Sequence, residues 1–126
     1  MASRRPGATE RSSAPRQEHW GVAAPRGDLA QLDIPADAGR ERTFEIYCSF
    51  VVARRSDQTA AAHALRVLVD GAQQWSRRVP TAAGPSDSLD VRLRRTVGVG
   101  LPLRVTAVGD VEGAVPLRLA ISADED

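Results

Sequence analysis

The amino-acid sequence predicts an all-β protein, an antiparallel β-sandwich of jelly-roll or Ig-like type with about 7 strands. Apolar and polar residues alternate in most segments, which is the period of a half-buried strand. Gly, Pro and Asp recur between those segments as turn signals. No stretch has the apolar period of an amphipathic helix. Short alternating strands separated by turns are typical of two packed antiparallel sheets.

The clearest strand covers residues 43–53. One phase of this segment is apolar and consists of Phe44, Ile46, Cys48, Phe50 and Val52. A run of this length, rich in aromatic and β-branched residues, predicts a central core strand. Cys48 lies in the apolar phase, so we expect a buried and unreactive thiol rather than a nucleophile.

Residues 65–75 predict a β-hairpin. Leu65, Val67 and Val69 alternate into the pair Asp70-Gly71, and Asp-Gly is among the strongest short hairpin signals because glycine tolerates a positive φ. Trp75 follows on the return strand. Whether its indole faces the core or the solvent bears directly on the function that we expect.

The remaining strands have weaker patterns. In the segment 29–34 the apolar phase slips between Leu29 and Leu32, which predicts an edge strand or a bulged one. Three later segments alternate more regularly and are expected to be strands with inward apolar phases, at 89–93, 101–107 and 115–121.

The chain is sized for one domain. Residues 1–18 are rich in Arg, Ser and Pro with no large apolar residue after Met1, so we expect a flexible arm. A single sandwich domain is expected over residues 19–123, followed by an acidic tail at 124–126. The opposite charges of arm and tail suggest contacts between neighbouring copies, so a homo-oligomer is one of the expected assemblies.

The composition excludes several classes of protein. The 17 basic residues, all arginine, nearly balance the 16 acidic ones, and a net charge of +1 makes nucleic acid an unlikely main partner. The single cysteine, Cys48, rules out an intrachain disulfide and a cysteine-rich metal site. No apolar run is long enough for a membrane helix, so we expect no membrane contact and a cytoplasmic location.

A set of arginines in the outward phase of the predicted strands is the best candidate surface for a partner or an anion: Arg92, Arg94, Arg104 and Arg118. If these strands are neighbours, the four side chains form a cationic stripe across one sheet. The alternative is an ordinary charged sheet face, with Asp90 and Glu45 as cross-strand partners.

Three aromatic residues are candidates for ligand binding, namely Trp75, Trp20 and Tyr47. Sugars and single-stranded nucleic acids are usually bound on exposed aromatic rings. The chain has few aromatic residues, and both phenylalanines fall in the core phase, so these three would have to supply any such platform.

No motif of a hydrolase, a phosphate-binding loop or a dinucleotide site occurs, and two histidines are too few for most metal or acid–base centres. We therefore expect no enzyme, with a hydrolase as the least favoured alternative, and no cofactor or metal. The main hypothesis is a non-catalytic interaction module that works through protein–protein contacts, as a subunit of a larger assembly or as an accessory module. The alternatives are a carbohydrate-binding accessory module using Trp75 and Trp20, and phosphate or nucleic-acid binding by the arm and the arginine stripe.

Overall fold

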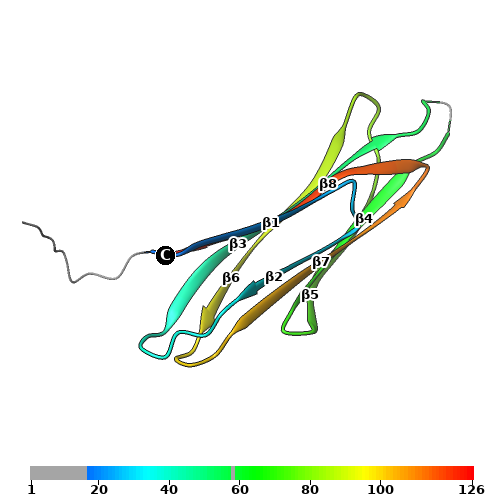
Figure 1. Ribbon diagram of the computed structural model, residues 1–126. Coiled ribbons are helices and arrows are strands. Elements are labelled where there is room, and N and C mark those ends of the chain that lie inside the picture. The colour runs from blue at the N-terminus through cyan, green and yellow to red at the C-terminus, as the bar shows by residue number, and fades with distance from the viewer. Residues whose placement is uncertain (1–16, 58) are drawn as a thin grey trace, which may run out of the picture.

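Eight β-strands and no helix make up the computed structural model over the residues that it describes, 17–57 and 59–126 (Figure 1). The strands are β1 (His19–Pro25), β2 (Leu29–Ile34), β3 (Arg42–Arg54), β4 (Ala62–Val69), β5 (Ala72–Pro80), β6 (Asp87–Val97), β7 (Leu103–Glu112) and β8 (Ala114–Glu125). The predicted all-β class is confirmed, with one strand more than expected.

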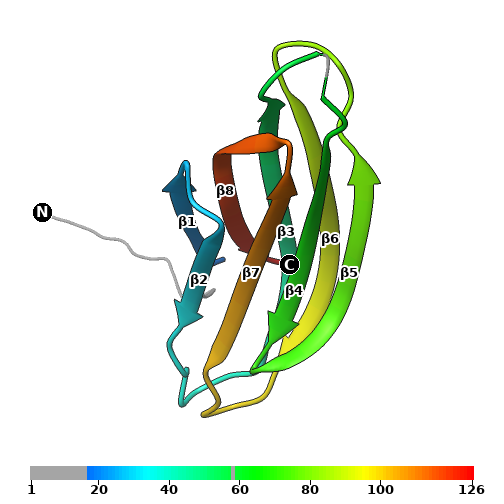
Figure 2. The same cartoon turned by 90° about the vertical axis from the view of Figure 1, so that its right-hand side faces the viewer.

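The strands form two antiparallel sheets of four that pack face to face (Figures 1 and 2). One sheet has the order β1-β8-β3-β6 and the other β2-β7-β4-β5. The first strand pairs with the last, the second with the seventh, the third with the sixth and the fourth with the fifth. This nesting is that of a long antiparallel ribbon rolled up on itself, so of the two predicted types the fold is the jelly roll.

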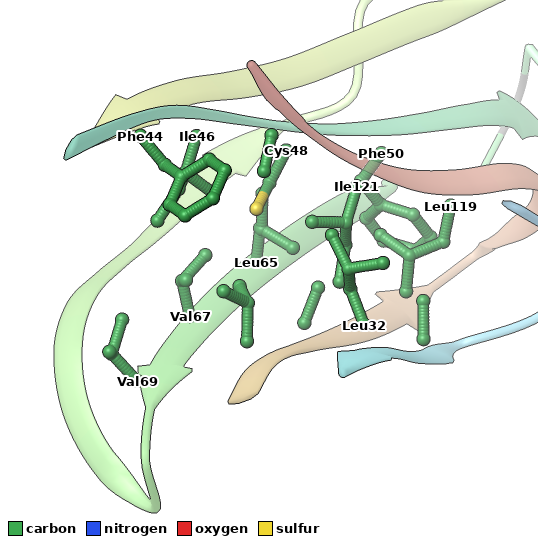
Figure 3. Close-up of a cluster of buried hydrophobic side chains, with 14 of the residues drawn as sticks. Leu32, Phe44, Ile46, Cys48, Phe50, Leu65, Val67, Val69, Leu119 and Ile121 are labelled. Carbon is green, nitrogen blue, oxygen red and sulfur yellow. The ribbon is translucent and has the colours of Figure 1, made fainter. Parts of the chain in front are cut away.

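The core lies between the two sheets, and β3 contributes its whole inward phase to it (Figure 3). The five apolar residues predicted for that phase are all 0% exposed. Cys48 is among them, and burial raises the pKa of its thiol to about 12. A thiol with this pKa is almost entirely protonated at neutral pH, which fits the predicted unreactive role.

The predicted hairpin is formed by β4 and β5 and closes at Asp70-Gly71. Both residues have a positive φ, 50° and 85°, which is the two-residue turn that suits the twist of the flanking strands. The register then shifts, because Val67 pairs with Trp75 but Leu68 pairs with Gln73. Gln74 is thus the extra residue of a β-bulge.

Strand β1 was not predicted. Its inward phase consists of Trp20, Val22 and Ala24, which are partly buried and pack against the core. Gly21 and Ala23 occupy the other phase, and Val22 is the one β-branched residue of the segment, so the pattern from which a strand is normally predicted is weak. The pairing with β8, which runs from His19 to Pro25, stabilises β1 instead.

Two details of the predicted apolar phases are wrong. Leu29 is 59% exposed and Ala30 takes its place in the core, so the inward phase of β2 runs through Ala30 without a slip. Leu101 is 57% exposed in the loop between β6 and β7, because β7 begins only at Leu103. The prediction that β2 is an edge strand is confirmed.

The inward phase of β8 also differs from the prediction, because a bulge interrupts it. Arg118 pairs with Val51 and Pro116 pairs with Val52, which leaves Leu117 as the extra residue, 37% exposed. A proline inside a strand that pairs on both sides is tolerated at such a bulge, because the ladder is already broken there.

The residues expected to form an acidic tail are part of the sandwich. β8 continues to Glu125, and Asp124 contacts His19 while Asp126 forms an ion pair with Arg94. These acids already have partners within the chain. They are therefore not free to bind the basic arm of a neighbouring copy, as the sequence had suggested.

Glu18, which we placed at the end of the arm, belongs to the folded part. It forms an ion network with Asp37, Arg40, Arg42 and Glu125 that ties both ends of the sandwich to the loop before β3. Hydrogen bonds from Arg40 lower the pKa of Glu125 to about 2. The rest of the predicted arm, residues 1–16, lies outside the described residues.

Arg42 is the buried member of this ion network, with a side chain 1% exposed. Its guanidinium donates to Glu18 at 2.8 Å and to the backbone oxygen of Pro35 at 2.9 Å, and lies over the ring of Phe44. A charge buried to this degree requires such partners.

Candidate functional site

The four arginines of the predicted stripe lie on both sheets. Arg92 and Arg94 are on β6 and Arg118 is on β8, in the same sheet but separated by β3. Arg104 is on β7, in the opposite sheet. A single stripe of all four across one sheet is therefore not formed.

Two of these arginines have acidic partners. Arg94 pairs with Asp126 and lies 3.9 Å from Glu45, its cross-strand neighbour. Arg104 donates to Asp33 at 2.7 Å, and this hydrogen bond holds the pKa of the Asp33 carboxyl below its usual value. For these two positions the cross-strand explanation fits better than a binding role.

The other two arginines have no ion pair with any described residue. The guanidinium of Arg92 stacks over the ring of Tyr47, 4.5 Å from its centroid. Arg118 borders a shallow hollow of about 500 Å³ on the outer face of the same sheet, beside Tyr47. The floor of this hollow consists of small residues from β1 and β8, namely Gly21, Ala23, Ala120 and Ser122.

The three aromatic candidates do not form a common platform. Trp20 and Trp75 are partly buried and pack against the core from opposite ends of the two sheets. The indole nitrogen of Trp20 donates to Glu18 at 2.9 Å. Tyr47 is on the outer face, but Arg92 covers one side of its ring. The indole of Trp75 thus faces the core and not the solvent, which the sequence alone left open.

The two lateral sides of the sandwich differ. On one side β1 and β2 lie close together and are joined by a tight turn, in which Gly27 donates to Ala24 at 3.1 Å. On the other side β5 and β6 have far fewer contacts with each other than β1 and β2 have, and each pairs with only one strand among the described residues. The sandwich is thus closed by β1 and β2 and open at β5 and β6.

We call this second region the open side. It consists of the inward-phase residues in the middle of the two edge strands: Trp75, Arg77 and Val79 on β5, and Val91, Leu93 and Arg95 on β6. The four apolar side chains pack against the core but are only partly buried. On the closed side the inward residues of β2 are buried and those of β1 are partly buried, whereas on the open side the inward apolar residues of both edge strands are only partly buried.

Two cations share the inward phase of the open side. Arg77 is exposed opposite Leu65 and has no ion pair with a described residue. Arg95 reaches across to β5, where its Nη2 donates to the side-chain oxygen of Gln74 at 2.6 Å, and its Nε is buried without a partner. No acidic residue lies in the inward phase between Trp75 and Val79 or between Leu89 and Val97.

One end of the sandwich also has a groove, of about 820 Å³. It is lined by Ile34, Pro35, Pro102 and Leu103 on its apolar wall, and by Asp33, Asp70 and Arg104 on its polar wall. The carboxylate of Asp70 accepts the backbone N–H of Arg104 at 2.9 Å, and Asp33 holds the guanidinium. These polar groups satisfy one another and serve to fix the hairpin turn against β7.

His63 is a further buried titratable group, with a side chain that is fully enclosed. Its Nδ1 is hydrogen-bonded to the Thr81 hydroxyl at 2.7 Å, and its Nε2 has no partner. Burial lowers the pKa of the imidazole, against a smaller opposing effect of Asp87. Among residues 17–57 and 59–126, no group of three or more His, Cys, Asp or Glu is placed to hold a metal ion.

No helix in the described part of the chain is long and apolar enough to cross a bilayer. A scan against protein-family models and a search of curated proteins both find no match for the chain. Comparison with solved structures finds likenesses at low sequence identity.

A segment of PorU from Porphyromonas gingivalis, crystallised as a latent dimer, has a TM-score of 0.51 and 9% identity over 87% of this chain. A chain of the T13 IBDV viral particle has a TM-score of 0.41 and 10% identity over 93% of this chain. The matched regions are 13% and 37% of those two chains, so this protein spans only a small part of each. The likeness to PorU shows the fold alone.

Proposed function

We propose that this chain is a non-catalytic jelly-roll interaction module that works through protein–protein contacts, as a subunit or accessory part of a larger assembly. The observation that carries the proposal is the open side. Two edge strands flank this side, each paired along one edge only, and the apolar side chains of their inward phases are covered only in part by the chain itself. Partly covered apolar side chains flanked by polar groups are typical of surfaces that contact another protein.

The placement of the aromatic residues favours this function over sugar binding. A sugar platform needs an exposed ring face, whereas Trp75 and Trp20 pack against the core and Arg92 covers Tyr47. The division of the arginines between the two sheets likewise weakens the proposal of a nucleic-acid surface. The proposal places the module in the cytoplasm, where a lone buried thiol such as Cys48 is stable in reduced form.

Site-specific photocrosslinking tests the proposal. A benzophenone amino acid in place of Ser76 on β5 is exposed next to the open side, and the same residue in place of Gln31 on β2 is equally exposed on the closed side. The full chain with either label is irradiated in extract of its source cells, and the adducts are identified by mass spectrometry. We expect a discrete protein adduct from position 76 and none from position 31.

The same adduct must disappear when unlabelled full chain is added in excess, because a specific site saturates. Equal labelling from both positions, or no adduct at either, would contradict the proposed function. Light scattering after size exclusion shows whether the captured protein is a second copy of the chain.

A further inference from the structure

We propose that the open side binds an extended acidic strand, which adds to the free edge of β6 and places its apolar side chains on Trp75, Val91 and Leu93. This inference rests on the proposed function and specifies the partner. Three properties of the open side support it. The backbone groups along one edge of β6 are unpaired, the apolar side chains are only partly buried, and arginines without an ion pair lie among them.

The backbone of β6 is the first element. β6 pairs with β3 along Asp87–Val97 and with no other described strand, so the peptide groups on its second edge are unpaired. The edge is long and regular, because no register shift interrupts the pairing with β3. Such an edge can be extended by a peptide in β conformation, with main-chain hydrogen bonds supplying the affinity.

The side chains select an alternating peptide. The inward phase of β6 presents Val91 and Leu93, both only partly buried, and Trp75 faces them from β5. A strand added to β6 directs every second side chain into this region, where apolar residues complete the cover of the core. Its other side chains lie on the outer face of the sheet, next to Arg92.

The free charge of Arg92 selects an acidic residue for the outer position beside it, whereas Arg94 is already paired with Asp126 and Asp90 is the one acid in the same phase of β6. The guanidinium of Arg92 stacks on the ring of Tyr47. Because the N–H groups lie in the plane of the guanidinium, stacking leaves them available to a carboxylate. Arg77 and Arg95 add positive charge in the inward phase, without an acid near them in that phase. An acidic side chain beside Arg92 on an added strand gains a cross-strand ion pair.

A second copy of this chain is the alternative occupant of the edge. Antiparallel pairing of two β6 edges centred on Arg92 opposes like charges, which is destabilising, whereas the register that sets Arg92 against Asp90 pairs opposite charges. Light scattering after size exclusion therefore accompanies the peptide measurements, and a dimer formed through β6 would overturn the acidic strand. The edge of β5 offers no better partner, because Arg77 and Arg78 would meet the same arginines. The acids near the C-terminus already have partners elsewhere in the chain, namely His19, Arg40 and Arg94.

Peptide binding to the full chain tests the proposal. The probes are capped, fluorescently labelled peptides of about eight residues, one alternating Val with Glu and one alternating Val with Lys. Fluorescence anisotropy measures their affinities. We expect saturable binding of the Glu peptide, weakening as salt rises, and no measurable binding of the Lys peptide.

Backbone N-methylation tests strand addition directly. Two further versions of the Glu peptide carry N-methyl groups on alternate residues. In one version every Val is N-methylated, and in the other every Glu is. An added strand uses the N–H groups of only one edge, so one of these peptides should bind like the parent and the other should not. Equal loss or equal retention in both would show that the peptide is not added as a strand.

Matched arginine variants locate the site. Arg92→Glu should weaken binding of the Glu peptide about fivefold, through the loss of one ion pair and a new repulsion. Arg118→Glu is the control, since this arginine is equally exposed and unpaired on the same face but lies on a strand inside the sheet. It should change the affinity less than about twofold. Circular dichroism confirms that both variants are folded.

The outcomes separate the two proposals. Binding of the Lys peptide, or equal effects of the two arginine variants, overturns the acidic strand. If neither peptide binds while photocrosslinking from position 76 still captures a protein, the partner chemistry is wrong and the interaction module stands. If both experiments fail, both proposals fall.

Discussion

Arg95 and Gln74 join the two sheets across the open side, with Nη2 of the guanidinium donating to the side-chain oxygen at 2.6 Å. Gln74 reaches this position because it is the extra residue of the bulge in β5. Bulges commonly redirect a side chain in this way. The contact is the one hydrogen bond recorded between β5 and β6 among the described residues, so it limits how far the two edge strands separate.

We expect Gln74→Ala to loosen β5 without unfolding the sandwich. The variant removes the acceptor on β5, while the strand keeps its full pairing with β4. Hydrogen exchange followed by mass spectrometry should show faster exchange in residues 72–80 and unchanged exchange in β3. The matched control is Gln73→Ala, because Gln73 is also exposed and has no side-chain hydrogen bond with a described residue. Equal acceleration in both variants would contradict the role of the contact.

Gly109 on β7 is required for its small size. A Cβ at this position would lie 2.5 Å from Cζ of Phe50, at the centre of the core. We expect Gly109→Ala to lower the free energy of unfolding by about 2 to 3 kcal/mol, as overpacking of a dense core usually does. Urea denaturation measures the effect.

Two variants control this prediction. Gly21→Ala adds the same methyl group where the nearest atom, the backbone oxygen of Ile121, is 3.6 Å away, so its effect should stay within about 0.5 kcal/mol. Phe50→Leu combined with Gly109→Ala should be less destabilised than the sum of the two single variants, because the smaller side chain leaves room. Additive losses would show that the close approach to Phe50 is not the cause.

The elements that could be predicted are those whose signals are local. The alternation in β3 and the Asp70-Gly71 turn each determine their structure within a few residues, and the structure agrees at both places. β1 was missed because its stability comes from pairing with β8, about a hundred residues later in the chain. The bulge that exposes Leu117 likewise depends on the partner strand.

The candidate site could be predicted only in part, because strand order is a non-local property. The outward phases of Arg92 and Arg104 are apparent from the sequence, but nothing local shows that β6 and β7 belong to different sheets. The open side was missed for the same reason. Its half-covered residues have the pattern of ordinary core positions, and only the position of β5 and β6 at the sheet edges exposes them.

Glu18 belongs to the folded unit. It accepts hydrogen bonds from the buried Arg42 and from Trp20, and its backbone N–H donates to Glu125. We expect a chain beginning at His19 to be less stable than one beginning at Gln17 by about 2 to 3 kcal/mol, because the buried guanidinium loses its carboxylate.

Urea denaturation of the two truncated chains measures this difference. Glu18→Gln in the full chain provides the control, since it keeps the backbone bond and removes only the charge, and its loss should be smaller. Equal stability of the two truncated chains would show that the ion network does not stabilise the ends.

The same network predicts acid sensitivity. The pKa of Glu125 is lowered from 4.5 to about 2, mainly by hydrogen bonds from Arg40. The folded state therefore holds fewer protons than the unfolded state between these values, and the stabilisation by Glu125 is complete above pH 4.5 and lost as the pH falls toward 2. Glu125→Gln should flatten the decline of unfolding free energy in that range. Glu41→Gln, at an exposed glutamate without an ion pair to a described residue, should not.

His63 predicts a second decline in the free energy of unfolding, at a higher pH than the decline caused by Glu125. Burial holds the pKa of its imidazole below 6.5, so the unfolded chain binds a proton that the folded chain rejects once the pH falls below that value. The contribution of neutral His63 is therefore complete above pH 6.5 and decreases below it, before Glu125 begins to titrate. In His63→Gln the side chain cannot titrate but its amide can still bond the Thr81 hydroxyl. Urea denaturation across this range should show a falling free energy of unfolding for the parent protein and a flat profile for the variant, and parallel profiles would mean that the buried imidazole does not control stability.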